Sequence, residues 1–127
     1  MSKSVISTSK APEAVGPYSQ AISANGLVFC SGQIPLDPAT GELIEGSIAD
    51  QTRRCMQSLS AVLEAARSSL IHLVKVTVYL ADIADYAEFN EAYAEFVGAE
   101  PPARAAFAVA ALPKGARVEV ECVALAS

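Results

Sequence analysis

The segment Leu73–Leu80 restricts the possible folds most, because it alternates like a strand and lies between two segments with helical periodicity. Its apolar side chains fall on one face: Val74, Val76, Val78 and Leu80. Its other face carries Lys75, Thr77 and Tyr79. A strand with one apolar face needs helices or a second sheet to cover that face. We therefore expect one sheet with both helices packed on its apolar side.

The first helix is expected to begin at Ser47 and to end between Arg67 and Ser69. Ser47 and Asp50 have the spacing of a capping box, in which each side chain accepts a hydrogen bond from the other's backbone. The apolar side chains recur at helical spacing and form one stripe: Ile48, Cys55, Met56, Leu59, Val62, Leu63 and Ala66.

The second helix is expected to run from Asp82, as its N-cap, to about Val97. Gly98 suits the C′ position that ends such a helix. Aromatic side chains predominate on one face: Tyr86, Phe89, Tyr93 and either Phe96 or Val97. This stripe predicts packing against the sheet.

Three strands are expected before the first helix, at residues 5–7, 19–24 and 27–31. A loop that contains Pro12, Gly16 and Pro17 separates the first two. Asn25-Gly26 predicts a type I′ turn between the second and third, because both residues tolerate positive φ. The third strand is apolar up to Cys30, which predicts that both of its faces are covered.

Residues 101–121 are expected to form a closing hairpin, with two apolar strands joined by a turn at Leu112-Pro113-Lys114-Gly115. The element order is then β-β-β-α-β-α-β-β, an α+β layout with one mixed sheet in a single domain, residues 1–127. The uncovered face of the sheet would carry Lys75, Thr77, Tyr79, Glu119, Glu121, Val123 and Leu125. Because the chain is 52% hydrophobic, we expect this face to meet other subunits.

The charge of the chain argues against two classes of partner. The formal net charge is −5, and no basic cluster is larger than Arg53-Arg54. Nucleic acids and anionic membranes both select for a basic patch, so neither is expected as a partner. A small anionic substrate remains possible, because one arginine can bind it locally.

The cysteine and histidine content predicts no metal site. His72 is the only histidine, and Cys30, Cys55 and Cys122 are widely spaced without a CxxC motif. An odd number of cysteines in apolar segments, with no recognisable signal peptide, predicts reduced thiols and a cytoplasmic location. No apolar run approaches the roughly 20 residues that a membrane span needs.

Arg104 and Glu119 are the residues of the 101–121 segment with the clearest chemical potential. Arg104 follows two prolines that stiffen the backbone, and its guanidinium suits a bidentate grip on a carboxylate; an ordinary surface arginine is the alternative. Glu119 lies within an apolar strand, where burial would raise its pKa and make it a candidate acid or base. Alternatively, Glu119 is solvated or paired with Arg117 or Lys75.

Three further residues are ambiguous from their own context. Ser31 ends an apolar strand and either presents its hydroxyl or amide to a ligand or simply terminates the strand. Tyr18, after Gly16-Pro17, is a lid residue or a core aromatic. Asn90 lies beside the aromatic stripe of the second helix without a clear role.

Six segments together resemble the RidA (YjgF) family in order and spacing, over essentially the whole chain. They are Gly16-Pro17-Tyr18-Ser19-Gln20, Ser31-Gly32-Gln33-Ile34-Pro35, residues 74–80, Phe89-Asn90-Glu91-Ala92-Tyr93, Pro102-Ala103-Arg104 and Val118-Glu119-Val120-Glu121. The resemblance implies a chorismate-mutase-like α+β fold and a homotrimer with an active site in each intersubunit cleft. It implies hydrolysis of 2-enamino and 2-imino acids, such as 2-aminoacrylate and 2-iminobutyrate, to 2-oxo acids and ammonia, without a cofactor.

The resemblance also implies roles for individual residues. Arg104 matches the arginine that binds the substrate carboxylate, and Glu119 the glutamate that positions or activates the hydrolytic water. The residues that match those lining the family's substrate cleft are Tyr18, Ser31, Gly32, Asn90 and Ala106. Many relatives have Cys, Thr or Ser where this chain has Ala106, so only a backbone contact is expected there. Arg104 and Glu119 are expected to form half a site that a neighbouring subunit completes.

Three other functions remain open at this point. The chain is alternatively a deaminase for another substrate, such as 2-aminomuconate. It is alternatively a non-catalytic, ligand-binding or chaperone-like module that uses the cleft or an apolar surface. A translation-inhibiting or RNA-cleaving role has been suggested for relatives, but the acidic balance of the chain weighs against it.

Overall fold

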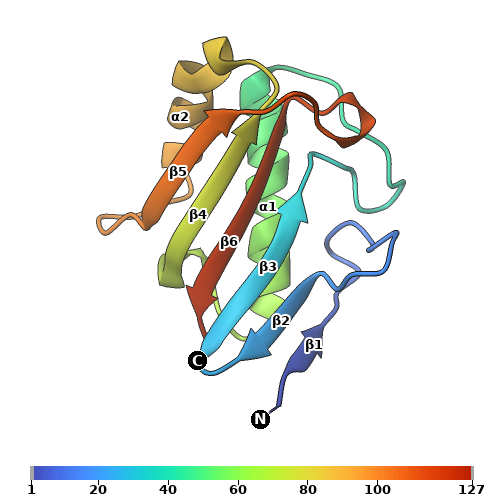
Figure 1. The fold of residues 1–127 in the computed structure, drawn as a ribbon, viewed down its shortest axis with the longest axis vertical. Helices are drawn as coiled ribbons and strands as arrows, with labels where there is room; N and C mark the ends of the chain where they lie inside the picture. Colours follow the sequence, from blue (N-terminus) through green and yellow to red (C-terminus); the bar gives the residue numbers. More distant parts are fainter. Residues whose placement is uncertain (1, 127) are drawn as a thin grey trace.

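Six strands form one mixed sheet, and two helices cover one of its faces (Figure 1). The computed structural model describes residues 2–126. The strands and helices are β1 Ser4–Ile6, β2 Ala21–Ala24, β3 Leu27–Gln33, α1 Ile48–Ala65, β4 Leu73–Leu80, α2 Tyr86–Ala94, β5 Ala103–Ala108 and β6 Val118–Leu125. Short 3₁₀ turns lie at η1 Leu70–His72, η2 Ile83–Asp85 and η3 Pro113–Gly115. The predicted α+β order and the single mixed sheet are confirmed.

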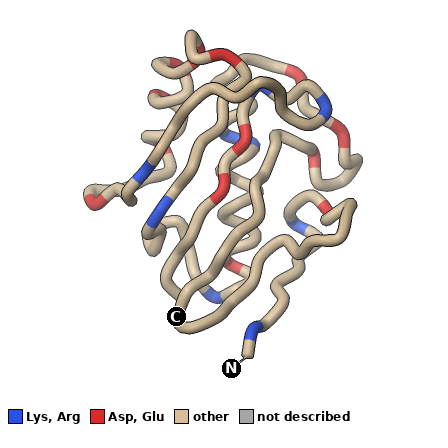
Figure 2. Tube along the Cα trace, in the orientation of Figure 1, with Lys and Arg blue, Asp and Glu red and all other residues tan. Residues whose placement is uncertain are grey.

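The prediction that residues 101–121 form a hairpin is wrong. The sheet order is β1-β2-β3-β6-β4-β5, so β4 lies between β5 and β6. β5 pairs parallel with β4, and β6 pairs antiparallel with β4 and with β3. A parallel pair needs a crossover connection, and α2 supplies it between β4 and β5. β5 is therefore an edge strand, and the acidic positions of β6 lie in the middle of the sheet (Figure 2).

Helix α1 begins as predicted, with both hydrogen bonds of the capping box between Ser47 and Asp50. It ends at Ala65, slightly before the expected range. Helix α2 is shorter than predicted at both ends. At its start, the Asp82 side chain caps η2 instead of α2, by accepting from the Ala84 N–H. Since α2 ends at Ala94, Gly98 does not occupy its C′ position.

The buried core lies between the helices and the sheet. Its largest fully buried side chains come from both layers and include Ile48, Met56, Leu59, Leu63, Val76, Leu80, Phe89, Val118 and Val120. Phe89 and Tyr93 stack on each other with ring centroids 5.4 Å apart. Burying a side chain of this size contributes about 1.5–3 kcal/mol, so the helical stripes anchor both helices to the sheet.

The face predicted for Val74 is wrong. The register between β4 and β6 shifts between Leu73 and Lys75, so Leu73 rather than Val74 points into the core. Val74 is 42% exposed, whereas Val76, Val78 and Leu80 are fully buried as expected. A bulge of this kind changes the two-residue alternation locally, which sequence periodicity does not reveal.

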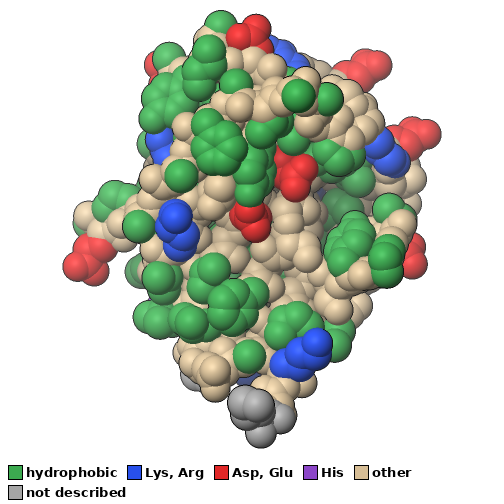
Figure 3. Space-filling view, viewed as in Figure 1, with side chains coloured by type: hydrophobic (Ala, Val, Ile, Leu, Met, Phe, Trp, Pro, Cys, Tyr) green, Lys and Arg blue, Asp and Glu red, His purple; other side chains and the backbone are tan. Residues whose placement is uncertain are grey.

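The face of the sheet opposite the helices is open and partly apolar (Figure 3). Phe29 and Phe107 are each 45% exposed on it, and Leu125 is 50% exposed. The expectation that β3 is covered on both faces is therefore wrong for the single chain. The alternation of β6 is as predicted, with Val118, Val120 and Cys122 buried and Glu119 and Glu121 on the open side.

Strand β3 is shaped at both ends by local backbone conformation. Asn25 and Gly26 both have positive φ, at 51° and 76°, which agrees with the predicted turn between β2 and β3. Near the other end, the register with β6 shifts between Cys30 and Gln33. Ser31 and Gly32 form this bulge, and it lies directly beside the acidic residues of β6.

Candidate active site

A cavity of about 410 Å³ opens beside the bulge of β3. It is lined by the loop before β2, the bulge, the end of β3 and the residues after it, η3 and one residue of β6: Pro12, Glu13, Val15, Tyr18, Gln20, Ser31, Gly32, Gln33, Ile34, Leu36, Pro113, Lys114 and Glu119. Four of the predicted site residues meet here, namely Tyr18, Ser31, Gly32 and Glu119. Most of the other lining side chains are apolar, so the cavity suits a small molecule with one polar end.

Glu119 is the acidic group of β6 that reaches this cavity, and it is half-buried. Burial raises the pKa of Glu119 above its ordinary value of 4.5, and the charge of Glu121 raises it further. Neither predicted cation neutralises Glu119: among residues 2–126, Arg117 forms its ion pair with Asp85, and Lys75 forms none. The geometry therefore favours a carboxyl group that can exchange a proton.

Gly32 makes room for this carboxyl group. A Cβ at position 32 would overlap Glu119 Oε2 and lie 2.9 Å from Cδ and 3.2 Å from Cγ. Real Cβ atoms essentially never come within 3.0 Å of another heavy atom. Absence of a side chain at Gly32 thus lets the Glu119 side chain lie against the backbone of the bulge.

We predict that Gly32→Ala displaces Glu119 and lowers turnover by about 10–100-fold, which is part of the roughly 10²–10⁴-fold that proton transfer by a positioned group supplies. The free energy of unfolding should change by less than about 1 kcal/mol, because the far end of Glu119 can move aside. A crystal structure of the variant and a urea titration check both statements. A Glu119 carboxyl group that remains in place would contradict the prediction.

The hydroxyl and the backbone N–H of Ser31 both form hydrogen bonds within the protein. Its hydroxyl donates to the Ser19 carbonyl at 2.6 Å, and its backbone N–H donates to the Gln20 carbonyl at 2.9 Å. Both bonds tie the loop before β2 to the bulge. Tyr18 lies at the end of that loop and is 52% exposed, so it lines the cavity and is not a core aromatic.

Gln20 is a buried residue that the sequence reasoning did not single out. Its side-chain amide donates to the carbonyls of Thr8, Ala11 and Pro12, and its side-chain oxygen accepts from the Thr8 N–H at 2.7 Å. One side chain thus satisfies several backbone groups of the loop that lines the cavity. The sequence feature that could have identified Gln20 is a polar residue near the start of a predicted strand, directly before Ala21.

Arg104 lies elsewhere, on the edge strand β5, where it contacts Tyr86 of α2. Its Nη2 donates to the Tyr86 hydroxyl at 3.0 Å. Its guanidinium carbon lies 4.9 Å from the ring centroid of Tyr93 and 5.7 Å from those of Tyr86 and Phe89. Aromatic faces attract a guanidinium at such distances, so these rings fix where its remaining N–H donors point.

Asn90 and Ala106 join the Arg104 group. Asn90 lowers the pKa of Tyr86 by hydrogen-bonding its hydroxyl, and the charge of Arg104 and its own hydrogen bond lower it further. Ala106 lies two residues after Arg104 on β5 and is partly buried against the core, so it shares the helix side of the sheet. The Arg104 group therefore consists of Arg104, Tyr86, Asn90 and Ala106.

The structure does not bring Arg104 and Glu119 together within one chain. Arg104 pairs with Val76, which is buried on the helix side of β4. Glu119 pairs with Tyr79 on the open side of β4. Paired residues of adjacent strands project to the same face, so Arg104 and Glu119 project to opposite faces. The expectation that they form one half-site is wrong: each belongs to its own group.

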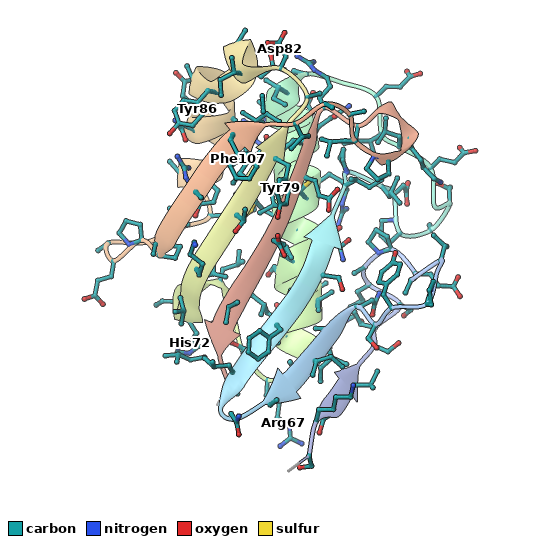
Figure 4. All side chains as sticks on the ribbon, in the orientation of Figure 1. Arg67, His72, Tyr79, Asp82, Tyr86 and Phe107 are labelled. Carbon is teal, nitrogen blue, oxygen red and sulfur yellow. The ribbon has the colours of Figure 1, made fainter. Side chains whose placement is uncertain are left out.

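Tyr79 and Glu121 are two further residues on the open face that the sequence reasoning did not assign to the site. The Tyr79 hydroxyl donates to Glu121 Oε1, which raises the pKa of Tyr79 to about 12. The Tyr79 ring meets Phe107 edge to face, with centroids 5.4 Å apart (Figure 4). Glu121 is thus fixed beside Glu119 on the same strand face.

The part of the chain that the structure describes contains no group of three or more His, Cys, Asp or Glu residues suited to a metal ion. Cys30, Cys55 and Cys122 are all buried and free. Within residues 2–126, no helix combines the length and the apolar character needed to cross a membrane.

Comparison with known proteins gives consistent matches over nearly the whole chain. The family described as Endoribonuclease L-PSP matches residues 8–126. A RutC family protein of Pyrococcus horikoshii is 52% identical over 96% of this chain and 97% of its own. The human 2-iminobutanoate/2-iminopropanoate deaminase is 46% identical over 95% of this chain and 88% of its own.

A solved structure agrees with these matches. RidA from an Antarctic Psychrobacter superposes with a TM-score of 0.92 at 44% identity, over 96% of this chain and 98% of that one. Fold, sequence and motif order point the same way, and the resemblance found in the sequence is confirmed. The chain belongs to the endoribonuclease L-PSP family, which includes reactive intermediate deaminase A.

Proposed function

We propose that this protein hydrolyses 2-imino acids, and the 2-enamino acids that tautomerise to them, to 2-oxo acids and ammonia. The observation that carries the proposal is Glu119, a half-buried carboxyl group with a raised pKa in a small, mainly apolar cavity. Relatives 44–46% identical over nearly the whole chain are named 2-iminobutanoate/2-iminopropanoate deaminase, which supports this reaction.

The proposed reaction needs one clamp and one proton carrier. Arg104 binds the substrate carboxylate and thereby fixes the adjacent C2. Water attacks C2 while Glu119 accepts one of its protons, and Glu119 then passes this proton to the nitrogen. As the C2–N bond breaks, Glu119 takes the proton of the new hydroxyl and passes it to the same nitrogen, so that the 2-oxo acid and ammonia leave and Glu119 is again a carboxylate. Backbone groups at Gly32 and Ala106 hydrogen-bond the nitrogen.

The two groups are proposed to meet between copies of the chain, in a homotrimer. Arg104 and Glu119 of one chain project to opposite faces of the sheet, so each needs a second copy to complete a site. The open face, with Phe29, Phe107 and Leu125 exposed, is the surface proposed to join the copies. The three free, buried cysteines fit a reducing compartment, and we assign the protein to the cytoplasm.

Mixed oligomers test this arrangement. When Arg104→Ala and Glu119→Gln chains are co-expressed in equal amounts, three-quarters of random trimers contain both, and each of these has one complete site in three. We therefore expect about a quarter of the wild-type activity from two chains that are each inactive. Light scattering should give the mass of a trimer. Activity no higher than the sum of the separate variants would mean that each site lies within one chain.

The reaction itself is tested with 2-aminoacrylate generated in place by a dehydratase. Added protein should raise the first-order rate of pyruvate release in proportion to its concentration, above the spontaneous rate. Side-by-side rates with the imines of larger amino acids and with 2-aminomuconate distinguish the preferred substrate. A rate that does not depend on protein concentration would contradict the proposed activity.

A ribonuclease activity is the second candidate, because the description of the matching family names an endoribonuclease. The chain has net charge −5, and no basic cluster in the sequence is larger than the pair Arg53-Arg54. Phosphate contacts dominate RNA affinity and weaken with salt. We expect no binding of single-stranded RNA at low salt by fluorescence anisotropy. Salt-sensitive binding accompanied by cleavage would favour the ribonuclease instead.

A further inference from the structure

The hydroxyl of Tyr86 has a hydrogen that no residue of the Arg104 group accepts. A tyrosine oxygen has one O–H to donate and two lone pairs that accept. Arg104 Nη2 donates to this oxygen at 3.0 Å, and the neighbouring Asn90 side chain lowers the pKa of the hydroxyl. Because the oxygen accepts from Arg104, its O–H is left to donate to another group.

The Tyr86 hydroxyl lies next to the guanidinium of Arg104. The Arg104 guanidinium packs against three aromatic rings and donates one N–H to Tyr86. The other N–H groups of Arg104 can donate to a ligand. Tyr86 is 39% exposed, so a ligand can reach its hydroxyl. Asn90 and the charge and hydrogen bond of Arg104 also lower the pKa of Tyr86, which makes its O–H a stronger donor.

We propose that Tyr86 is a substrate-binding residue, whose O–H donates to the same carboxylate that Arg104 holds. This rests on the proposed function, because it names a second donor in the clamp assigned there to Arg104. The substrate carboxylate then receives a bidentate grip from the guanidinium and one additional hydrogen bond from the phenol. Asn90, Tyr86 and Arg104 then act as one connected group of side chains. Asn90 orients the phenol of Tyr86, and the phenol orients the guanidinium of Arg104.

The proposal makes Tyr86 a determinant of binding rather than of the chemical step. A carboxylate is present in the substrate, in the transition state and in the 2-oxo acid product alike. Loss of one hydrogen bond to it therefore weakens all three equally, which raises KM and leaves kcat unchanged. A hydrogen bond to a charged group is strong enough for its loss to weaken binding by about tenfold.

The test compares Tyr86→Phe with wild type, using 2-oxobutanoate as the stable probe in calorimetry and 2-iminobutanoate in turnover. We expect Kd and KM to rise about tenfold, with kcat within twofold. Glu91→Gln is the matched control, an exposed change on the same helix that should leave Kd unchanged. A structure of the wild type with 2-oxobutanoate should place the Tyr86 oxygen within hydrogen-bond distance of the carboxylate.

The outcomes separate this inference from the proposed function. If Arg104→Ala abolishes 2-oxobutanoate binding while Tyr86→Phe binds like wild type, the role of Tyr86 is wrong and the clamp stands. If Tyr86→Phe lowers kcat with KM unchanged, Tyr86 acts in the chemical step and the inference is again wrong. If the wild type binds no 2-oxobutanoate, both the inference and the proposed clamp fail.

Discussion

Arg104→Ala should lower kcat/KM for 2-iminobutanoate by about 10²–10³-fold. Removing one partner of a desolvated, hydrogen-bonded charge pair costs about 2–5 kcal/mol, and each 1.4 kcal/mol is a factor of ten. Most of the loss should appear in KM and in the Kd of 2-oxobutanoate, because the carboxylate is bound in every state of the reaction. Steady-state kinetics with a dehydratase-generated substrate measures the change.

Two companion variants show whether the geometry or only the charge of Arg104 matters. Arg104→Lys keeps a cation but loses the planar fork, so its kcat/KM should lie between those of Arg104→Ala and wild type. Arg53→Ala removes an exposed arginine that pairs with Glu95 at 2.9 Å, and it should leave kcat/KM unchanged. Equal rates for wild type and Arg104→Ala would contradict the carboxylate clamp, and equal losses at both arginines would point to net charge.

Glu119→Gln should lower kcat by about 10²–10⁴-fold, the usual contribution of a positioned acid or base. Glutamine has nearly the same shape and keeps the cavity filled, but it cannot accept the proton of the attacking water. Binding of 2-oxobutanoate should therefore persist with little change in Kd. Calorimetry together with single-turnover kinetics distinguishes the two effects. Lost binding with unchanged kcat would make Glu119 a binding residue rather than a proton carrier.

The pH dependence of the reaction gives a second measure of Glu119. Its pKa is raised by burial and, in addition, by the charge of Glu121. The reaction starts from the carboxylate form, so kcat should fall as pH falls through this raised pKa, above the value of 4.5 for an ordinary glutamate. Glu121→Gln removes the second cause, which should move the acid limb of the pH profile to lower pH. Glu64→Gln, on the exposed side of α1, should leave the limb in place.

Features set by neighbouring residues could be predicted from the sequence. The capping box at Ser47 and Asp50 and the turn at Asn25-Gly26 depend on contacts within four residues, and both are present as expected. The apolar stripe of α1 and the alternation of β6 follow from the fixed periods of helix and strand. These periods also identified which face of β6 carries Glu119.

Features set by distant segments could not be predicted in this way. The two strands of residues 101–121 are close in sequence, yet β4 lies between them because α2 carries the chain across to the edge of the sheet. The bulge at Val74 depends on its register with β6, about 50 residues away. Gln20 likewise acts on Thr8, Ala11 and Pro12, whose backbone groups lie across a loop.

The sequence alone determined the elements, their order, the open face of the sheet and the residue types able to bind a carboxylate and carry a proton. Only the tertiary structure decided that Arg104 and Glu119 belong to separate groups, one with Tyr86 and Asn90 and one with Gly32. The physical reason is that a two-residue period fixes the relative faces within one strand, whereas pairing with β4 fixes which side of the sheet each strand presents.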